Sequence, residues 1–255
     1  MTVYLEASID YLSVGRKKVC QALSLACKKG EFWCVLGPNG SGKTTLLHTL
    51  AGLRPAEKAQ VFLRSQLLDT VPLKYRAEQV GLLFQDQPIP IAHTVYEGLR
   101  IVNARHRQNH SFTQHLENVL NLMDLTLLKN RLIHHLSGGE RQRFNIAMLF
   151  MQNPDAFLLD EPTNYLDLRH QMKVLTLLKK LTRTEKKMMI AVVHDINLAY
   201  QFADQACFLY STGVAKVGAR DELFNEKTLS ELYEEPIKKI ISQEGQIYWH
   251  ACFTS

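Results

Sequence analysis

The sequence lacks the long apolar stretch that a membrane-spanning helix needs. Its longest run without a charged residue is about eleven residues, whereas a helix that crosses a bilayer needs about twenty apolar ones. The first basic residue, Arg16, comes after the acidic residues Glu6 and Asp10, which is unlike a secretory signal peptide. We therefore expect a chain that does not enter a membrane by itself.

Cysteines are few, and no two of them have the spacing of a metal-binding or redox pair. An odd number of cysteines without a C-x-x-C pair argues against a disulfide framework and against a zinc site. Reduced, mostly buried thiols in a cytosolic compartment are the expectation for all five: Cys20, Cys27, Cys34, Cys207 and Cys252.

No repeat or low-complexity tract divides the 255 residues, and no excess of one charge dominates them. The net charge of +5 arises from short basic clusters among interleaved acidic residues, which is typical of a solvated surface. A patch for nucleic acid or an anionic membrane is the less favoured alternative. With 46% hydrophobic residues, the chain is expected to form one large globular domain or two small ones.

The apolar pattern changes along the chain from strands to helices and back to strands. A glycine-rich turn separates the third predicted strand from the first predicted helix, and helical spacing then holds from about Thr94 to Gln152. This order predicts a parallel α/β core with an inserted helical subdomain. The predicted strands are Val3–Ile9, Ala22–Cys27, Glu31–Leu36, Ala156–Leu159 and Met188–Val193, and the predicted first helix is Lys43–Leu53.

The glycine-rich turn fits G-x-x-x-x-G-K-[ST], the pattern of a loop that wraps around triphosphate oxygens. Glycines let backbone amides approach the phosphates, and the following helix N-terminus favours anions. We expect Lys43 to meet the β- and γ-phosphates of ATP and the Thr44 hydroxyl to bind Mg²⁺. The predicted ATP-binding residues here are Gly37, Pro38, Asn39, Gly40, Ser41, Gly42, Lys43, Thr44 and Thr45.

Two later strands end in side chains that suit phosphate chemistry. The strand Ala156–Leu159 ends at Asp160 and Glu161, where the first carboxylate is expected to hold Mg²⁺ and the second to accept a proton from the attacking water. The strand Met188–Val193 ends at His194, which is expected to bridge the γ-phosphate and that water.

A second anion site is predicted at Ser137, where a capping serine and two glycines precede a helix. A chain with one phosphate loop needs no second anion site, unless that site serves a nucleotide bound elsewhere. The segment Leu136–Arg143, LSGGERQR, resembles the signature loop of ATP-binding subunits of ABC transporters, and the resemblance runs from about Leu5 to Pro236. It places Gln85 in the Q-loop, Asp167 in the D-loop and His194 as the switch histidine.

The resemblance implies a P-loop NTPase (RecA-like) core with a mostly parallel sheet, an antiparallel β subdomain and an inserted α-helical subdomain. The implied divisions are a core of residues 1–86 and 154–221, a helical subdomain of 87–153 and a tail of 222–255. The implied catalytic residues are Glu161, His194, Lys43 and Gln85, and the implied Mg²⁺ ligands are Thr44, Gln85 and Asp160. Two subunits would form a head-to-tail homodimer, each completing the other's ATP site with Ser137, Gly138, Gly139, Glu140 and Asp167.

Within that family, residues 160–171 and 194–199 resemble the importers of iron chelates, haem and cobalamin. This implies a separate polytopic permease, a substrate-binding protein, no nucleic acid, and a cytoplasmic location on the inner face of a bacterial membrane. The alternatives are an exporter subunit and a non-transport ABC ATPase that acts on ribosomes or DNA. The cargo stays open among siderophore-bound iron, haem and cobalamin.

Two departures from the family pattern bear on the site and the tail. The family tail usually reads Tyr-Gly-Val, where this chain has Tyr233-Glu234-Glu235-Pro236. An aromatic side chain usually stacks on adenine, and Tyr11 is our prediction for it, although a gap-free count points to Val14. Three histidines of the helical segment, His106, His110 and His115, are expected on a polar helix face rather than at a metal.

Overall fold

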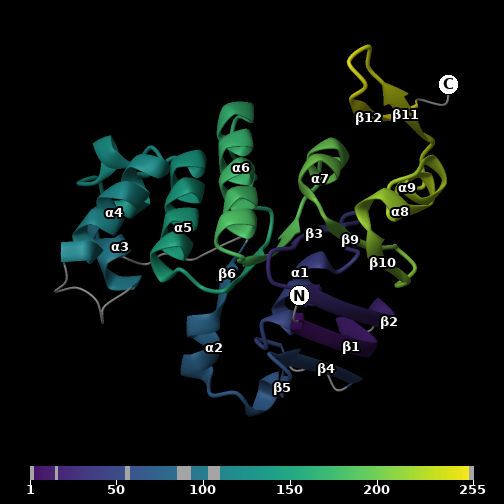
Figure 1. Ribbon diagram of the computed structural model, residues 1–255, viewed down its shortest axis with the longest axis horizontal. Coiled ribbons are helices and arrows are strands. Elements are labelled where there is room, and N and C mark those ends of the chain that lie inside the picture. Colours follow the sequence, from purple (N-terminus) through teal and green to yellow (C-terminus); the bar gives the residue numbers. More distant parts are fainter. Residues whose placement is uncertain (1–2, 15–16, 55–57, 85–92, 103–109, 253–255) are drawn as a thin grey trace.

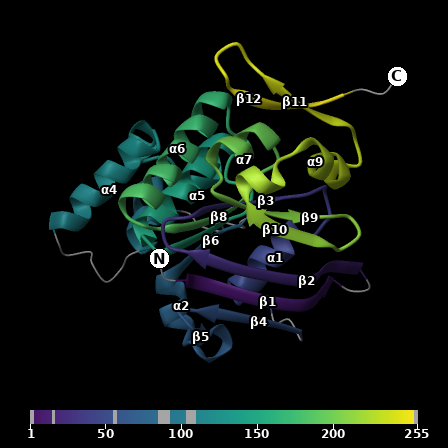
Figure 2. The ribbon, with the colours of Figure 1, turned by 45° about the vertical axis from the view of Figure 1, so that its right-hand side comes forward.

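The computed structural model describes residues 3–14, 17–54, 58–84, 93–102 and 110–252 (Figure 1). In this part of the chain a six-stranded sheet, a four-stranded sheet and a two-stranded hairpin are present. Figure 2 shows the four-stranded sheet on one side of the six-stranded sheet and most helices on the other. This arrangement confirms the predicted fold class, a P-loop NTPase core with an antiparallel subdomain and a helical insertion.

The six-stranded sheet has the order β10-β9-β3-β8-β7-β6 and is parallel except for β10. Its inner strands β3, β7 and β8 are buried along their whole length, as their continuous apolar sequences predict for a sheet covered on both faces. The carboxyl ends of the parallel strands meet at one edge, where the predicted site residues follow. The strands are β3 (Phe32–Leu36), β6 (Val80–Leu83), β7 (Ala156–Leu159), β8 (Met188–Val192), β9 (Gln205–Leu209) and β10 (Ala215–Ala219).

The antiparallel sheet has the order β2-β1-β4-β5 and contains the first two predicted strands, both longer than the alternation indicated. Its strands are β1 (Val3–Val14), β2 (Lys17–Lys28), β4 (Lys58–Leu63) and β5 (Gln66–Leu67). Helix α2 (Leu73–Gln79) connects this sheet to β6.

The first helix, α1, spans Lys43–Leu50 and not Lys43–Leu53 as predicted. Gly52 adopts the left-handed conformation with φ at 70°, and the Leu53 N–H donates to the carbonyl of His48 at 3.0 Å. Since this pattern satisfies the last carbonyls of a helix, the helix ends before Gly52. The Ala51-Gly52 pair was the available sequence signal for this end.

The segment of helical spacing forms a separate group of helices at one end of the molecule (Figure 1). Its elements in the described residues are α3 (Val95–Val102), α4 (His110–Leu122), α5 (Gly138–Gln152) and the short 3₁₀ turns Thr126–Leu128 and Ile133–His135. The packing of α3 against α5 is close, because a Cβ on Gly98 would lie 2.8 Å from both Ile133 and Phe144.

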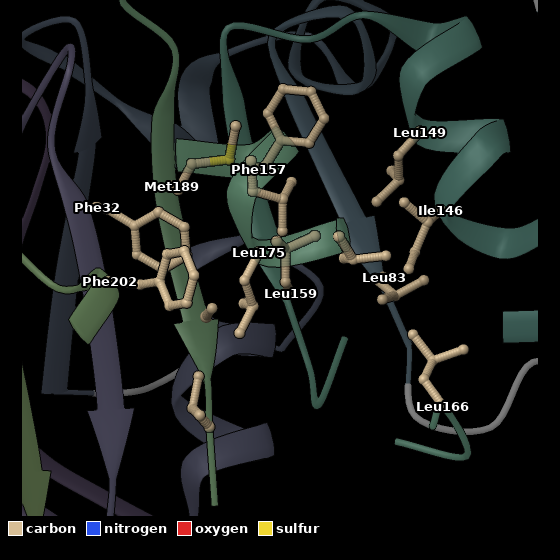
Figure 3. Close-up of a cluster of buried hydrophobic side chains, with 14 of the residues drawn as sticks. Phe32, Leu83, Ile146, Leu149, Phe157, Leu159, Leu166, Leu175, Met189 and Phe202 are labelled. Atoms are coloured by element: carbon tan, nitrogen blue, oxygen red, sulfur yellow. The ribbon is translucent and has the colours of Figure 1, made fainter. Parts of the chain in front are cut away.

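The central sheet separates two hydrophobic cores. In β3, Phe32 and Cys34 point into the core on the helical side, whereas Trp33 and Val35 point into the core shared with α1 and the antiparallel sheet. Figure 3 shows the helical side, where residues of the sheet meet residues of α5 and α6 (Leu168–Thr184). The expectation of free, mostly buried cysteines is met: all five are unpaired and only Cys252 is partly exposed.

The chain after the last core strand forms two short helices and a hairpin. These elements are α8 (Arg220–Leu223), α9 (Glu226–Tyr233), β11 (Ile237–Ile241) and β12 (Ile247–Ala251), and the hairpin contacts α7 (Ile196–Phe202). Glu234 ends α9 with φ at 58°, at the position where the family tail usually has glycine. Its carboxylate accepts a hydrogen bond from the Ser211 hydroxyl at 2.6 Å, so this chain keeps the left-handed helix end without glycine.

Candidate active site

The phosphate loop connects the end of β3 to the start of α1, and its glycines are required by shape. Gly37 has φ at 155°, and a Cβ there would overlap the carbonyl oxygen of Leu209. Gly42, at the start of α1, has φ at 96°, and a Cβ there would overlap the side chain of Val19. Both positions therefore need glycine for backbone conformation and for space.

Lys43 lies inside this loop, with only 6% of the residue exposed. Its ammonium donates hydrogen bonds to the carbonyls of Gly37 at 2.9 Å and Pro38 at 3.0 Å. Burial lowers the pKa of Lys43, and the nearby carboxylates of Glu161 and Asp160 oppose that shift. The loop thus holds a cation at the end of β3, beside the carboxylates that follow β7.

Asp160 is a buried carboxylate, with 1% of the residue exposed. Among the described residues neither carboxylate oxygen accepts a hydrogen bond of good geometry. Burial raises the pKa of Asp160, and Glu161 adds to the shift, whereas the Thr44 hydroxyl and Lys43 favour the ionised form. A buried carboxylate with free acceptor capacity, next to a threonine hydroxyl, is the kind of oxygen donor set that Mg²⁺ prefers. Asp160 and Thr44 therefore fit the metal that their motifs predict.

Replacing Asp160 by Asn should stabilise the nucleotide-free protein while weakening MgATP binding. The amide removes a charge that is costly to bury without a partner, so we expect a gain of about 1–3 kcal/mol. Because the folded-state pKa of Asp160 is raised, the wild type loses stability as pH rises from the unfolded pKa through the folded pKa. The Asp160→Asn variant should not show this loss of stability with rising pH. Urea unfolding at several pH values, with and without MgATP, measures both effects; an unstabilised variant with normal MgATP binding would contradict them.

Glu161 and His194 form the closest polar contact of the site. The Nε2 of His194 lies 2.6 Å from Oε1 of Glu161, and the Asn164 amide donates to Oε2 at 3.3 Å. Glu161 has φ at 50°, and its carbonyl accepts a hydrogen bond from the buried Gln142 side chain at 3.1 Å. A left-handed backbone at a non-glycine residue is strained, so these contacts hold the carboxylate in a fixed direction.

This pair lines a pocket at the ends of β7 and β8. The pocket has a volume of 220 Å³ and includes Asn164 and Tyr165 of the loop before α6. Glu161 is largely shielded, with 14% of its side chain exposed, whereas 47% of the His194 side chain is exposed. A carboxylate that is fixed at the bottom and an imidazole at the rim can together orient a water molecule.

The signature loop begins α5 with a complete capping box. The Ser137 hydroxyl accepts from the Glu140 N–H at 3.3 Å, and the Glu140 carboxylate accepts from the Ser137 N–H at 2.8 Å. Gly139 lies close to the loop before α6, because a Cβ there would be 2.9 Å from the Tyr165 carbonyl oxygen. The predicted second anion site and the D-loop are thus packed together within one chain.

Asp167 of the D-loop caps the N-terminus of α6. Its Oδ1 accepts from the His170 N–H at 2.8 Å and lies 2.8 Å from the His170 ring Nδ1. These hydrogen bonds lower the pKa of Asp167. The other ring nitrogen of His170 lies 3.6 Å from Asp124, beyond the end of α4, so His170 connects the D-loop to the helical group.

Comparison with known proteins identifies the family of this site. The ABC transporter family matches residues 20–164, which contain the phosphate loop, the signature loop and the acidic pair. The chain belongs to the ABC transporter family. Since the ATP-binding proteins of this family are ATPases, the chain binds ATP and hydrolyses it.

Individual relatives match over nearly the whole chain. The petrobactin import ATP-binding protein FpuD of Bacillus anthracis is 34% identical over 240 residues, 90% of this chain and 86% of the relative. The hemin import ATP-binding protein HmuV of Rhodopseudomonas palustris is 30% identical over 254 residues, 96% and 93% of the two chains. The dimeric post-hydrolysis structure of the ATP-binding cassette MJ0796, bound to ADP and Pi, matches with a TM-score of 0.75 and 26% identity, covering 85% and 98%.

Some predicted site residues of this ABC cassette do not line the pocket of Glu161 and His194, and others are outside the described residues. Gln85, His106 and the side chain of His110 are outside the described residues. Tyr11 lies in β1 and lines a surface pocket of the antiparallel sheet with Asp10 and Lys58. His115 Nε2 lies 3.2 Å from the Phe150 carbonyl, and no metal-binding cluster is found in the described segments.

Three residues that support the site were not predicted from the sequence: Gln142, Asn164 and Gln171. The buried Gln142 side chain donates to the carbonyls of Glu161 and Pro162, and the Gln171 side chain donates to the carbonyls of Thr163 and Leu166. All three are amides within or next to the recognised motifs, so proximity to those motifs was the available signal. Among the described helices, none has the length and apolar composition that a bilayer crossing requires.

Proposed function

We propose that the chain is the ATP-hydrolysing subunit of an importer for a metal chelate of the siderophore-iron or haem type. The observation that carries this proposal is the near full-length similarity to petrobactin and hemin import ATP-binding proteins. The geometry of the Glu161–His194 pair beside Lys43 and Asp160 supports the hydrolytic part. Cobalamin remains the third cargo that the sequence pattern suggests.

In this mechanism the phosphate loop, residues 37–45, binds the triphosphate through backbone amides, and Lys43 exchanges its loop carbonyls for phosphate oxygens. Thr44, Asp160 and Gln85 would hold Mg²⁺, and the metal would supply positive charge to neutralise the phosphates. Glu161 accepts a proton from the attacking water, and His194 donates a hydrogen bond at the γ-phosphate. Positioning and electrostatic stabilisation supply most of the rate.

A second copy of the chain completes each site. Its Ser137, Gly138, Gly139 and Glu140 present helix N-terminal amides to the γ-phosphate. Its Asp167 belongs to the loop whose Tyr165 packs against Gly138 and Gly139. The capping box and the packing against Tyr165 hold this loop ready for a nucleotide that its own phosphate loop does not bind. The head-to-tail homodimer is two-fold symmetric, so it contains two equal ATP sites.

The membrane part belongs to other chains. A polytopic permease docks on the helical subdomain, residues 87–153, while Gln85 relays the state of the nucleotide to that docking surface. A substrate-binding protein delivers the chelate from outside, and the chain lies on the cytoplasmic face of the membrane. The tail, residues 222–255, stays with the ATP-binding core of residues 1–86 and 154–221.

Affinity purification from detergent-solubilised membranes tests the transport function. We expect a polytopic membrane protein to co-purify, and an Ile101→Asp substitution on the exposed surface of α3 to reduce its recovery without changing ATP binding. Leu73→Asp on α2 is the matched control, because Leu73 is 66% exposed and lies outside the helical subdomain. Recovery of ribosomes or DNA in place of a membrane protein would favour the non-transport alternative. Loss of chelate uptake by cells lacking the chain distinguishes import from export.

A further inference from the structure

The C-terminal hairpin lies against the helix that follows the switch histidine. Figure 1 shows β11 and β12 on the same side of the central sheet as α7, although α7 ends at Phe202 and the hairpin begins only at Ile237. The contact is made by Trp249 of β12, which is 5% exposed. Its indole ring packs against Tyr200 of α7 and against Phe224, which follows α8, with ring centroids 5.8 Å and 6.4 Å apart.

Asn197, in the first turn of α7, pairs with the backbone of this hairpin. Its Oδ1 accepts from the Trp249 N–H at 2.7 Å, and its Nδ2 donates to the Trp249 carbonyl at 3.2 Å. One side chain thus satisfies both backbone groups of a single strand residue, as a neighbouring strand would. Two hydrogen bonds in opposite directions fix the position and the orientation of the hairpin relative to α7.

Asp195 lies between His194 and Asn197 in the sequence. Its Oδ1 caps α7 by accepting from the N–H groups of Asn197 and Leu198 at 2.8 Å and 2.9 Å. The charge of Asp195 adds to burial in raising the pKa of Tyr233 at the end of α9, although the tyrosine hydroxyl makes no hydrogen bond with any described residue. The tail therefore binds this segment at Asn197, three residues after His194.

We propose that the C-terminal hairpin is a positioning element for His194, and that Asn197 is the positioning residue that connects them. The inference rests on the proposed role of His194 in hydrolysis. The His194 side chain is 47% exposed, and the polar contact that the described residues make with it is the one between its Nε2 and Oε1 of Glu161 at 2.6 Å. Its backbone follows β8, where the Val193 N–H donates to the Val35 carbonyl at 3.3 Å, and the Asn197–Trp249 pair holds the chain on the other side of His194, three residues later.

The test compares Asn197→Ala with Tyr248→Ala in the full-length protein. The first substitution removes both hydrogen bonds to Trp249, whereas Tyr248 is 44% exposed and precedes Trp249 on the same strand. We expect Asn197→Ala to lower kcat by about tenfold, with KM for ATP within about twofold, because two hydrogen bonds are lost and a catalytic group is displaced. Tyr248→Ala should keep both constants.

Acrylamide quenching of tryptophan fluorescence reports on the hairpin directly. The chain has two tryptophans, and Trp33 is buried in the other core, so a rise in quenching reports exposure of Trp249. In Asn197→Ala this rise should accompany the loss of kcat. Normal kcat with an exposed Trp249, or an equal loss of kcat in Tyr248→Ala, would overturn the proposal.

A double-mutant cycle separates this inference from the proposed function. If Asn197 acts through His194, then Asn197→Ala should cause no further loss of turnover in a His194→Ala background. Multiplicative losses in the double variant would show that the hairpin acts elsewhere. Unchanged turnover in His194→Ala alone would instead reject the role of His194, whatever the behaviour of the hairpin.

Discussion

Glu161→Gln is expected to lower ATP turnover by roughly 10²–10⁴ while ATP still binds. The amide keeps the size of the carboxylate and retains polar contact with His194 and Asn164, whose atoms lie 2.6 Å and 3.3 Å from the Glu161 oxygens. It cannot accept a proton from water. It also removes a negative charge that acts on Lys43, so the affinity for ATP should stay equal or rise.

Steady-state turnover and equilibrium binding of a fluorescent ATP analogue measure the two effects separately. Glu244→Gln, in the exposed turn of the hairpin, is the matched control, because it makes the same chemical change far along the chain from the pocket. Turnover within a few-fold of the wild type in Glu161→Gln would remove Glu161 from the role of base. A parallel loss of binding and turnover would instead indicate a structural effect.

Gly42→Ala should destabilise the protein by about 2–5 kcal/mol and abolish ATP binding. The added methyl group meets Val19 of β2, and the backbone at φ 96° is unfavourable for any residue with a Cβ. Because Gly42 begins α1, relief of the overlap must move the loop amides or the strand β2. Both movements spoil the shape that the phosphates require.

Gly245→Ala provides the control for this prediction. Gly245 has φ at 78°, but nothing lies within 4 Å of the position that its Cβ would take. The alanine there should cost only the conformational strain, about 1 kcal/mol. Urea unfolding gives the difference between the two variants, and the thermal shift caused by MgATP reports binding. Equal destabilisation of both would show that the contact with Val19 is unimportant.

The sequence predicted that the motif residues lie close together, because they follow buried parallel strands. Strand ends at one edge of a parallel sheet must lie together, so Asp160, Glu161 and His194 were expected to meet. The sequence could not predict the hairpin contact, since Trp249 belongs to no recognised motif and lies far along the chain from Asn197. The left-handed conformation of Glu234 could not be predicted either, because glycine is the usual signal for that conformation.

The helix end at Gly52 shows a different kind of error. Leu53 continued the apolar spacing of the first helix, but the residue is 51% exposed and follows the turn. Apolar periodicity alone extends the predicted helix three residues beyond its end at Leu50. Gly52, a residue type that signals a helix end, stands one position before Leu53. Local backbone chemistry decided the boundary there.

The position of the central sheet between two cores has a consequence for the energetics of turnover. The phosphate loop, the acidic pair and the switch histidine leave from β3, β7 and β8, strands that are clamped by apolar side chains on both faces. The conformational entropy of such strands is lost when the whole protein folds. Little further entropy can therefore be lost at their ends. The motif side chains therefore start already aligned, so the free energy of ATP binding need not be used to order them.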